Sequence, residues 1–198
     1  MAPVSVPTDK LQEFVDFDAF YVWLAENHDQ ADEIWIRIFK NASGKPTITP
    51  VEAIDAALCW GWIDAIKKSW DAESFVQRYC PRRPKSVWSQ INRDNVARLV
   101  KQGLMNEHGL KHVEAAKADG RWDAAYRTNQ TPPDDLLAAI AANPAAQETY
   151  DGLSSQNRFA LTFRTISLKS EAGRKKRIAD YVAMLARGEA IYPQKAKS

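Results

Sequence analysis

The chain has 198 residues, a length that suits one domain, or one core with a helical appendage, better than a multidomain assembly. With 45% hydrophobic and 26% charged residues, its composition excludes collagen-like, disordered and disulfide-rich proteins, and no apolar run reaches the roughly 18 residues that a membrane helix needs. The formal net charge of +2 gives the whole chain no marked preference for an anionic partner.

The first predicted elements are a helix, a strand and a second helix. Asp16 can cap a helix whose apolar residues recur at helical spacing as far as Leu24. Residues 33–39 alternate isoleucines with other side chains, which predicts a strand. Thr49-Pro50-Val51-Glu52 combines a capping box with proline at the first helical position, so a second helix is expected before Gly61.

A hairpin is predicted next. Residues 62–66 and 73–80 are short alternating runs separated by six residues, and Pro81 and Pro84 then end the sheet. With the loop centred near residue 70, Asp64 on the first strand is expected opposite Arg78 on the second, close enough for a cross-strand ion pair.

Everything after about residue 86 is predicted to be helical, so the fold class is α+β: a small antiparallel sheet with two helices in the N-terminal half and a helical C-terminal half. Residues 1–126 are expected to form an α+β domain that holds the sheet and a basic Pro-Arg-Arg-Pro segment, and residues 134–190 a C-terminal helical subdomain that shares its core. The predicted helices cover residues 88–101, 107–118 and 136–142, and three more begin at Pro144, near Ser155 and near Glu171.

Several kinds of chemistry have no signature in the sequence. The eight glycines do not include the spaced pair of a dinucleotide fingerprint, and neither a P-loop, a nucleophile elbow nor a Cys-x-x-Cys pair is present. His108 and His112 lie one helical turn apart, but without a convincing third ligand we expect exposed histidines and no metal. Cys59 is expected to be a buried, inert thiol. We therefore assign no catalytic residue and no cofactor, and the absence of a signal sequence predicts a cytoplasmic protein.

Charge is unevenly distributed along the chain. Residues 1–40 hold three basic and eight acidic side chains, whereas residues 75–101 hold seven basic and one acidic. Residues 164–187 hold seven basic and two acidic side chains, most simply as a solvated helix face. The block at 75–101 is the more informative one, because arginines there are flanked by prolines and tryptophans.

Three segments carry a resemblance to a known family. Residues 57–64 (Ala-Leu-Cys-Trp-Gly-Trp-Ile-Asp), 77–92 (Gln-Arg-Tyr-Cys-Pro-Arg-Arg-Pro-Lys-Ser-Val-Trp-Ser-Gln-Ile-Asn) and 114–123 (Glu-Ala-Ala-Lys-Ala-Asp-Gly-Arg-Trp-Asp) resemble the bacterial YdeI/OmpD-associated family, also labelled bacteriocin-protection proteins. The resemblance extends over roughly residues 50–188. It implies a role in tolerance to bacteriocins, antimicrobial peptides or stress, and it supplies no catalytic residues.

The residues themselves suggest an anion-binding pocket. Two prolines stiffen the segment that carries Arg82 and Arg83, next to a helix start where free backbone N–H groups favour an anion. Asn92 is expected on the packed face of that helix, in the arc of Trp88, Ile91, Val96 and Leu99. The hypothetical ligand-binding set is Trp62, Asp64, Arg78, Arg82, Arg83, Ser86, Trp88 and Asn92.

Other interpretations remain open. In a structural one, the two tryptophans are core residues and Asp64, Arg78 and Asn92 form a satisfied polar network. The functional alternatives are a non-catalytic binder of an anionic small molecule or protein partner, an enzyme that uses Asp64 as acid or base on an anionic substrate, and, ranked third, a nucleic-acid binder. The nucleic-acid interpretation rests on the basic block at residues 78–98: Arg82, Arg83, Lys85, Arg93 and Arg98, with Trp88 available for stacking.

Overall fold

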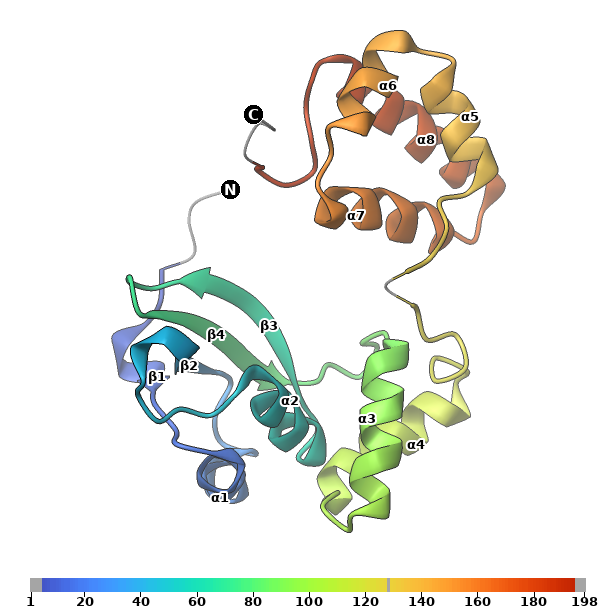
Figure 1. Ribbon diagram of the computed structural model, residues 1–198. Helices are drawn as coiled ribbons and strands as arrows, with labels where there is room; N and C mark the ends of the chain where they lie inside the picture. The colour runs from blue at the N-terminus through green and yellow to red at the C-terminus, as the bar shows by residue number, and fades with distance from the viewer. Residues whose placement is uncertain (1–4, 128, 195–198) are drawn as a thin grey trace. The chain divides into compact units, whose positions relative to one another are not determined.

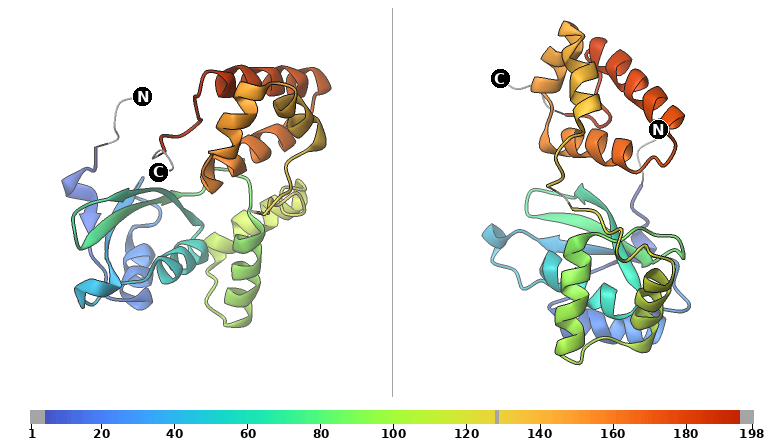
Figure 2. Two further views of the ribbon diagram at one scale, coloured as in Figure 1. Left: turned by 45° about the horizontal axis from the view of Figure 1, so that its top comes forward. Right: turned by 90° about the vertical axis from the view of Figure 1, so that its right-hand side faces the viewer.

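A computed structural model describes residues 5–127 and 129–194 of the chain. The chain divides into two compact units, the first ending at Ala125 and the second beginning at Tyr126. Figure 1 shows the sheet in the N-terminal unit, and both views in Figure 2 show helices α5 to α8 gathered in the C-terminal unit. The predicted α+β class, with the sheet in the N-terminal half, is confirmed.

The N-terminal unit is built on a four-stranded sheet of order β1-β2-β4-β3. Strands β2 and β4 and strands β3 and β4 pair antiparallel, and the two-residue β1 pairs parallel to β2. The sequence predicted β2, β3 and β4 but not β1 or two single-turn 3₁₀ helices. The elements are 3₁₀ helices Thr8–Lys10 and Asn41–Ser43; β1 Leu11–Gln12, β2 Ile34–Phe39, β3 Trp62–Ser69, β4 Ser74–Pro81; and α1 Phe17–Asn27, α2 Pro50–Cys59, α3 Gln90–Lys101, α4 Glu107–Ala118.

Helices α1 and α2 cover one face of the sheet, as Figure 1 shows. Both begin where the sequence predicts: the Asp16 carboxylate accepts the Ala19 N–H at 2.9 Å, and Thr49 and Glu52 form the expected capping box. The isoleucines of β2 point from the sheet toward these two helices and are buried there. The buried cluster comprises Phe14, Phe20, Leu24, Ile34, Ile36, Ile38, Ile48, Ala53, Ala56, Ala57, Trp62 and Tyr79.

The hairpin register differs from the predicted one. Asp64 lies opposite Tyr79, whereas Arg78 faces Trp35 of β2, so the predicted pairing of Asp64 with Arg78 is wrong. The cause is the position of the loop: Ser69 pairs with Phe75, so the hairpin is centred at residue 72 and not near residue 70. An irregularity between Asp64 and Lys67 then shifts the register by one residue, to Tyr79. Because alternate side chains of a strand point to opposite faces, this one-residue difference places Asp64 and Arg78 on different sides of the sheet.

Helix α3 begins later than predicted. Its N-cap is Ser89, whose hydroxyl accepts the Asn92 N–H at 3.1 Å, so Trp88 precedes the helix. Ile91 is 54% exposed rather than packed, while Val96 and Leu99 are buried as expected. Asn92 is half-buried.

The C-terminal unit consists of four helices with their own buried cluster. Helix α7 is capped by Ser154 and α8 by Ser170, close to the predicted starts. Its helices are α5 Asp134–Ala141, α6 Pro144–Asp151, α7 Ser155–Ile166 and α8 Glu171–Ala186, and its buried residues are Leu136, Ile140, Ala146, Tyr150, Leu153, Leu161, Ile178, Tyr181 and Leu185. In the described residues each helix is too short or too polar to cross a bilayer.

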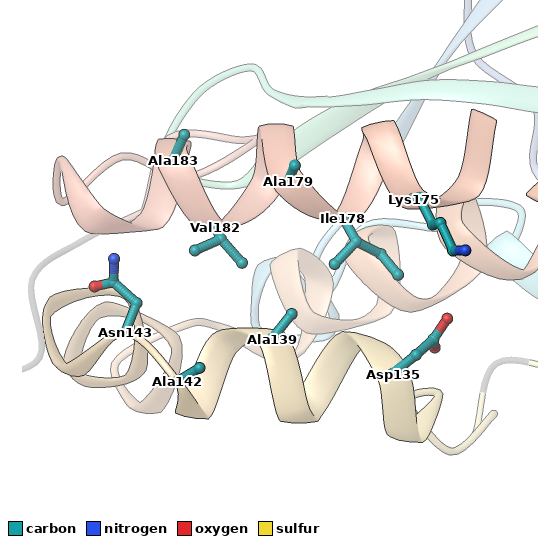
Figure 3. A pocket seen from close by; sticks show the side chains of 9 residues that line it. All are labelled: Asp135, Ala139, Ala142, Asn143, Lys175, Ile178, Ala179, Val182 and Ala183. Atoms are coloured by element: carbon teal, nitrogen blue, oxygen red, sulfur yellow. The ribbon is translucent and has the colours of Figure 1, made fainter. Parts of the chain in front are cut away.

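A groove of about 660 Å³ runs between α5 and α8. Figure 3 shows Ala139 of α5 facing Ile178 of α8, with Asp135 and Lys175 at one end. Both charges have partners: Arg174 donates to Asp135 at 2.6–2.7 Å, and Lys175 pairs with a glutamate one turn earlier. The groove therefore offers mainly apolar contact.

Candidate functional site

The eight residues of the hypothetical pocket do not line a common pocket. Trp62, on β3, is 1% exposed and packs edge-on against Trp23 with ring centroids 5.9 Å apart. Its indole N–H donates to the carbonyl of His28 at 3.2 Å. Trp62 is thus a core aromatic whose polar atom is bonded to the loop after α1.

Asp64 occupies a half-buried position at the start of β3. Gln77 donates to its carboxylate at 3.4 Å, and Tyr79 lies directly across the strand pair. Burial raises the pKa of Asp64, an effect that the backbone, Arg82 and Gln77 counteract. Burial, together with the nearby Asp64 charge, likewise raises the pKa of the Tyr79 hydroxyl. Asp64 belongs to a polar group at the edge of the core.

Arg78 lies on the other face of the sheet. It forms an ion pair with Glu33, which immediately precedes β2, and 30% of the Arg78 side chain is exposed. Because the partner of Arg78 is Glu33, the arginine does not contribute to a site with Asp64.

The two arginines between the prolines have opposite environments. Arg82 is 3% exposed, its guanidinium lies 3.7 Å from the centroid of the Trp88 ring, and it donates to the Val87 carbonyl at 3.0 Å. The Arg82 backbone N–H also donates to Gly61 at 2.9 Å. Arg83 is exposed. The structure therefore brings Arg82 and Trp88 together as a packed pair and leaves Arg83 on the surface.

The two remaining residues of the set, Ser86 and Asn92, form backbone hydrogen bonds. The Ser86 carbonyl accepts a hydrogen bond from Arg121 at 2.9 Å, and the Asn92 N–H is bonded to the Ser89 cap. Both therefore fix the entry into α3.

A hollow of about 240 Å³ adjoins this region, and we call it the histidine hollow. It contains all three histidines of the chain, which come from segments about 80 positions apart. Of the predicted set only Trp62 lines it. The lining residues are His28, Asp29, Trp60, Gly61, Trp62, Pro81, His108, Lys111 and His112.

Two glycines allow the walls of the hollow to meet. A Cβ at Gly109 would lie 2.4 Å from the carbonyl oxygen of Cys59, so only glycine lets α4 approach the end of α2 this closely. A Cβ at Gly61, whose φ is +75°, would lie 2.5 Å from the His112 ring. His112 and His108, one turn apart on α4, are thereby set against the connection from α2 to β3.

Three rings of the hollow are in mutual contact. The centroid of His28 lies 4.2 Å from that of His108 and 4.7 Å from that of Trp60, and Trp60 stacks on His108 at 5.9 Å. His28 caps α1, so these contacts join α1, the end of α2 and α4. Aromatic rings at such distances attract one another beyond the area they bury.

A hydrogen bond orients the His28 ring. Its Nδ1 lies 3.0 Å from the carbonyl oxygen of Leu24, and because a carbonyl only accepts, Nδ1 carries the proton. Nε2 of His28 and the indole N–H of Trp60 are both buried without a hydrogen-bond partner among the described residues.

Positive groups surround His112. Its pKa is lowered from 6.5, first by burial and then by the charges of Arg82 and Arg121. Lys111, one residue earlier, is exposed at the edge of the hollow, as is Asp29. The electrostatic surroundings of His112 are therefore mainly cationic, whereas Nε2 of His108 lies 3.7 Å from a carboxylate oxygen of Glu107.

Metal and thiol chemistry find little support at this site. In residues 5–127 and 129–194 no group of three or more His, Cys, Asp or Glu side chains is placed to hold a metal ion. Cys59 is buried, and burial raises its pKa to about 12, so its thiolate is disfavoured at neutral pH.

Sequence reasoning missed most of the histidine hollow. It noted the spacing of His108 and His112 but predicted exposed side chains, whereas both are half-buried and face other elements. Nothing in the spacing connects them to His28, because the link is made only when α4 packs on α2. A glycine between two histidines on a helix was the available signal.

The contrast between the two arginines gives a prediction. Arg82→Ala removes a buried charge-assisted hydrogen bond and a cation–π contact, so the free energy of unfolding should fall by roughly 2–4 kcal/mol. Arg83→Ala, the matched control, should change it by less than about 0.5 kcal/mol. Urea unfolding followed by tryptophan fluorescence measures both, and equal effects of the two substitutions would contradict the assignment.

The lowered pKa of His112 predicts a pH-dependent stability. As the pH falls through about 6.5, the unfolded chain takes up a proton at this residue before the folded protein does, so the free energy of unfolding decreases. In His112→Gln this component should vanish, and the stability should vary less between pH 7.5 and 5.5. Unfolding curves at several pH values provide the test; the same pH dependence in both proteins would show that His112 is not the cause.

Comparison with known families divides the chain in two. Residues 12–112 match the family described as Domain of unknown function (DUF8412), and residues 129–188 match the one described as Bacteriocin-protection, YdeI or OmpD-Associated. The resemblance inferred from sequence is thus confirmed at residues 129–188, whereas its segments 57–64 and 77–92 fall within the first match. Neither a curated protein nor a solved structure shows significant similarity.

The first match covers about half of the chain and contains the sheet and the whole histidine hollow. The second covers α5 to α8. Residues 129–188 are similar to the bacteriocin-protection, YdeI or OmpD-associated family, and the chain belongs, through its N-terminal unit, to the DUF8412 family.

Proposed function

We propose that the protein binds a small anionic molecule in the histidine hollow and that it does so without catalysing a reaction. The observation that carries the proposal is the meeting of all three histidines of the chain at one hollow with Lys111 at its edge. The Lys111 ammonium, the Trp60 indole N–H, which has no partner in the part of the chain described, and the imidazoles of α4 offer donors suited to carboxylate or phosphate oxygens. The Nδ1 of His28 is already bonded to Leu24, so this ring contributes to the wall of the hollow. The guanidiniums that lower the pKa of His112 add positive potential.

This site replaces the pocket suggested by the sequence as the place of binding. Within that set Arg82 is occupied with Trp88 and Arg78 with Glu33, so neither guanidinium presents the open clamp that the sequence suggested. Arg82 instead acts through its charge, at a distance from the ligand. Trp62 is common to both sites.

The two alternative functions find less support. An enzyme that uses Asp64 needs substrate beside that carboxylate, but Asp64 is bonded to Gln77 and is not among the residues that line the hollow. Nucleic-acid binding needs free basic side chains. Arg98 is bonded to both oxygens of Asp55 at 2.7 Å and Arg82 is buried, so the basic block is reduced chiefly to the exposed Arg83 and Lys85. The small anion is therefore favoured over both.

Histidine resonances in NMR spectra test the proposal directly, because all three imidazoles lie in the hollow. Titration with acetate, benzoate, inorganic phosphate and short dicarboxylates should reveal at least one anion that shifts all three imidazole signals saturably. If none of these anions moves them at millimolar concentration, the proposal fails.

The control uses two exposed lysines of the same unit. Lys111→Gln removes a charge at the edge of the hollow and should weaken binding about two- to fivefold, as for a solvent-exposed ion pair. Lys101→Gln, at the end of α3, removes the same charge elsewhere and should leave the affinity unchanged. Equal effects of both variants would point to net charge instead of a site.

We also propose the tolerance role that the family description of residues 129–188 names. Expression of the full chain in a bacterial strain sensitive to a bacteriocin should raise the concentration of that bacteriocin needed to stop growth. Growth inhibition at the same concentration with and without the protein would argue against this role.

A further inference from the structure

We infer that the histidine hollow binds a small carboxylate with a single aromatic ring. Five aromatic residues and a lysine line the hollow, and its volume is about that of one ring with a small substituent. This inference rests on the proposed function and narrows the class of anion.

The walls favour a ring over an aliphatic chain or an inorganic ion. Five of the nine lining residues are aromatic, and Gly61 and Pro81 add further apolar surface. The His28 ring is tilted at 43° to Trp60 and at 61° to His108, whereas Trp60 and His108 are nearly parallel at 21°. An inserted planar ring would therefore meet both faces and edges, the arrangements in which aromatic rings attract.

The volume limits the ligand to about one ring with a small substituent. The hollow measures about 240 Å³. A benzene molecule is known to fill an apolar cavity of about 150 Å³, and sites for drug-sized ligands begin near 300 Å³. A ring with a carboxylate lies between these limits, whereas a nucleotide or a peptide exceeds them.

The charges favour one negative group. Lys111 provides a cation at the edge of the hollow, and the Trp60 indole N–H is a buried donor without a partner in the described part of the chain. Asp29, the one acidic residue among those lining the hollow, would repel a second negative charge. A monocarboxylate thus suits the lining better than a phosphate dianion.

Calorimetric titration of the full-length protein can compare benzoate, cyclohexanecarboxylate and inorganic phosphate. The first two share their charge and approximate size but differ in aromaticity. Benzoate should bind about fivefold or more tightly than cyclohexanecarboxylate, and should shift the three imidazole signals in NMR spectra. Trp60→Leu should reduce the benzoate affinity about fivefold or more, whereas Trp70→Leu, at an exposed indole in the β3–β4 loop, should leave it unchanged.

Equal affinities for benzoate and cyclohexanecarboxylate would overturn the aromatic specificity while leaving anion binding intact. Tighter binding of phosphate than of benzoate would do the same. If Trp60→Leu and Trp70→Leu bind benzoate as the unchanged protein does, the ring is not recognised in the hollow and the inference fails. Lack of binding by all three probes, and by acetate and short dicarboxylates as well, would remove the proposed function too.

Discussion

The close approach of α4 to the end of α2 is the constraint on which the candidate site depends. It is possible because residue 109 has no side chain: the Cβ of any other residue would overlap the carbonyl oxygens of Leu58 and Cys59. The Asn106 N–H donates to the Cys59 carbonyl at 3.1 Å at the same contact, so the start of α4 is hydrogen-bonded to the end of α2. Two histidines of α4 are thereby brought to His28.

The same contact organises the packing around it. Leu58 and Cys59 of α2 share a buried cluster with Val113 and Ala116 of α4 and with residues of α3. Trp88 belongs to this cluster and carries the Arg82 guanidinium on its ring. The buried arginine thus links the last strand of the sheet to the helices, and it supplies part of the positive potential near His112.

Local features of the fold could be predicted from the sequence, whereas long-range ones could not. The Asp16 cap and the Thr49–Glu52 capping box depend on neighbouring residues, and both are confirmed. The register of Asp64 depends on an irregularity that a period-two pattern does not encode. Likewise, Arg82 and Arg83 are the same residue type at adjacent positions, and only the packing of Trp88 decides which is buried.

The histidine hollow joins α1, the end of α2 and α4, so no sequence spacing could reveal it. The expected division at residues 126 and 134 with a shared core stays a prediction.

Substitution of Gly109 by alanine tests the central claim most directly. If the glycine contact assembles the hollow, cross-relaxation between the His28 and His108 ring protons should be strong in NMR spectra of the unchanged protein, where the ring centroids are 4.2 Å apart. It should be lost in Gly109→Ala, with a drop of roughly 1–3 kcal/mol in the free energy of unfolding. Gly152→Ala, where an added Cβ makes ordinary contacts, should preserve both. An unchanged His28–His108 signal and unchanged stability in Gly109→Ala would contradict the account.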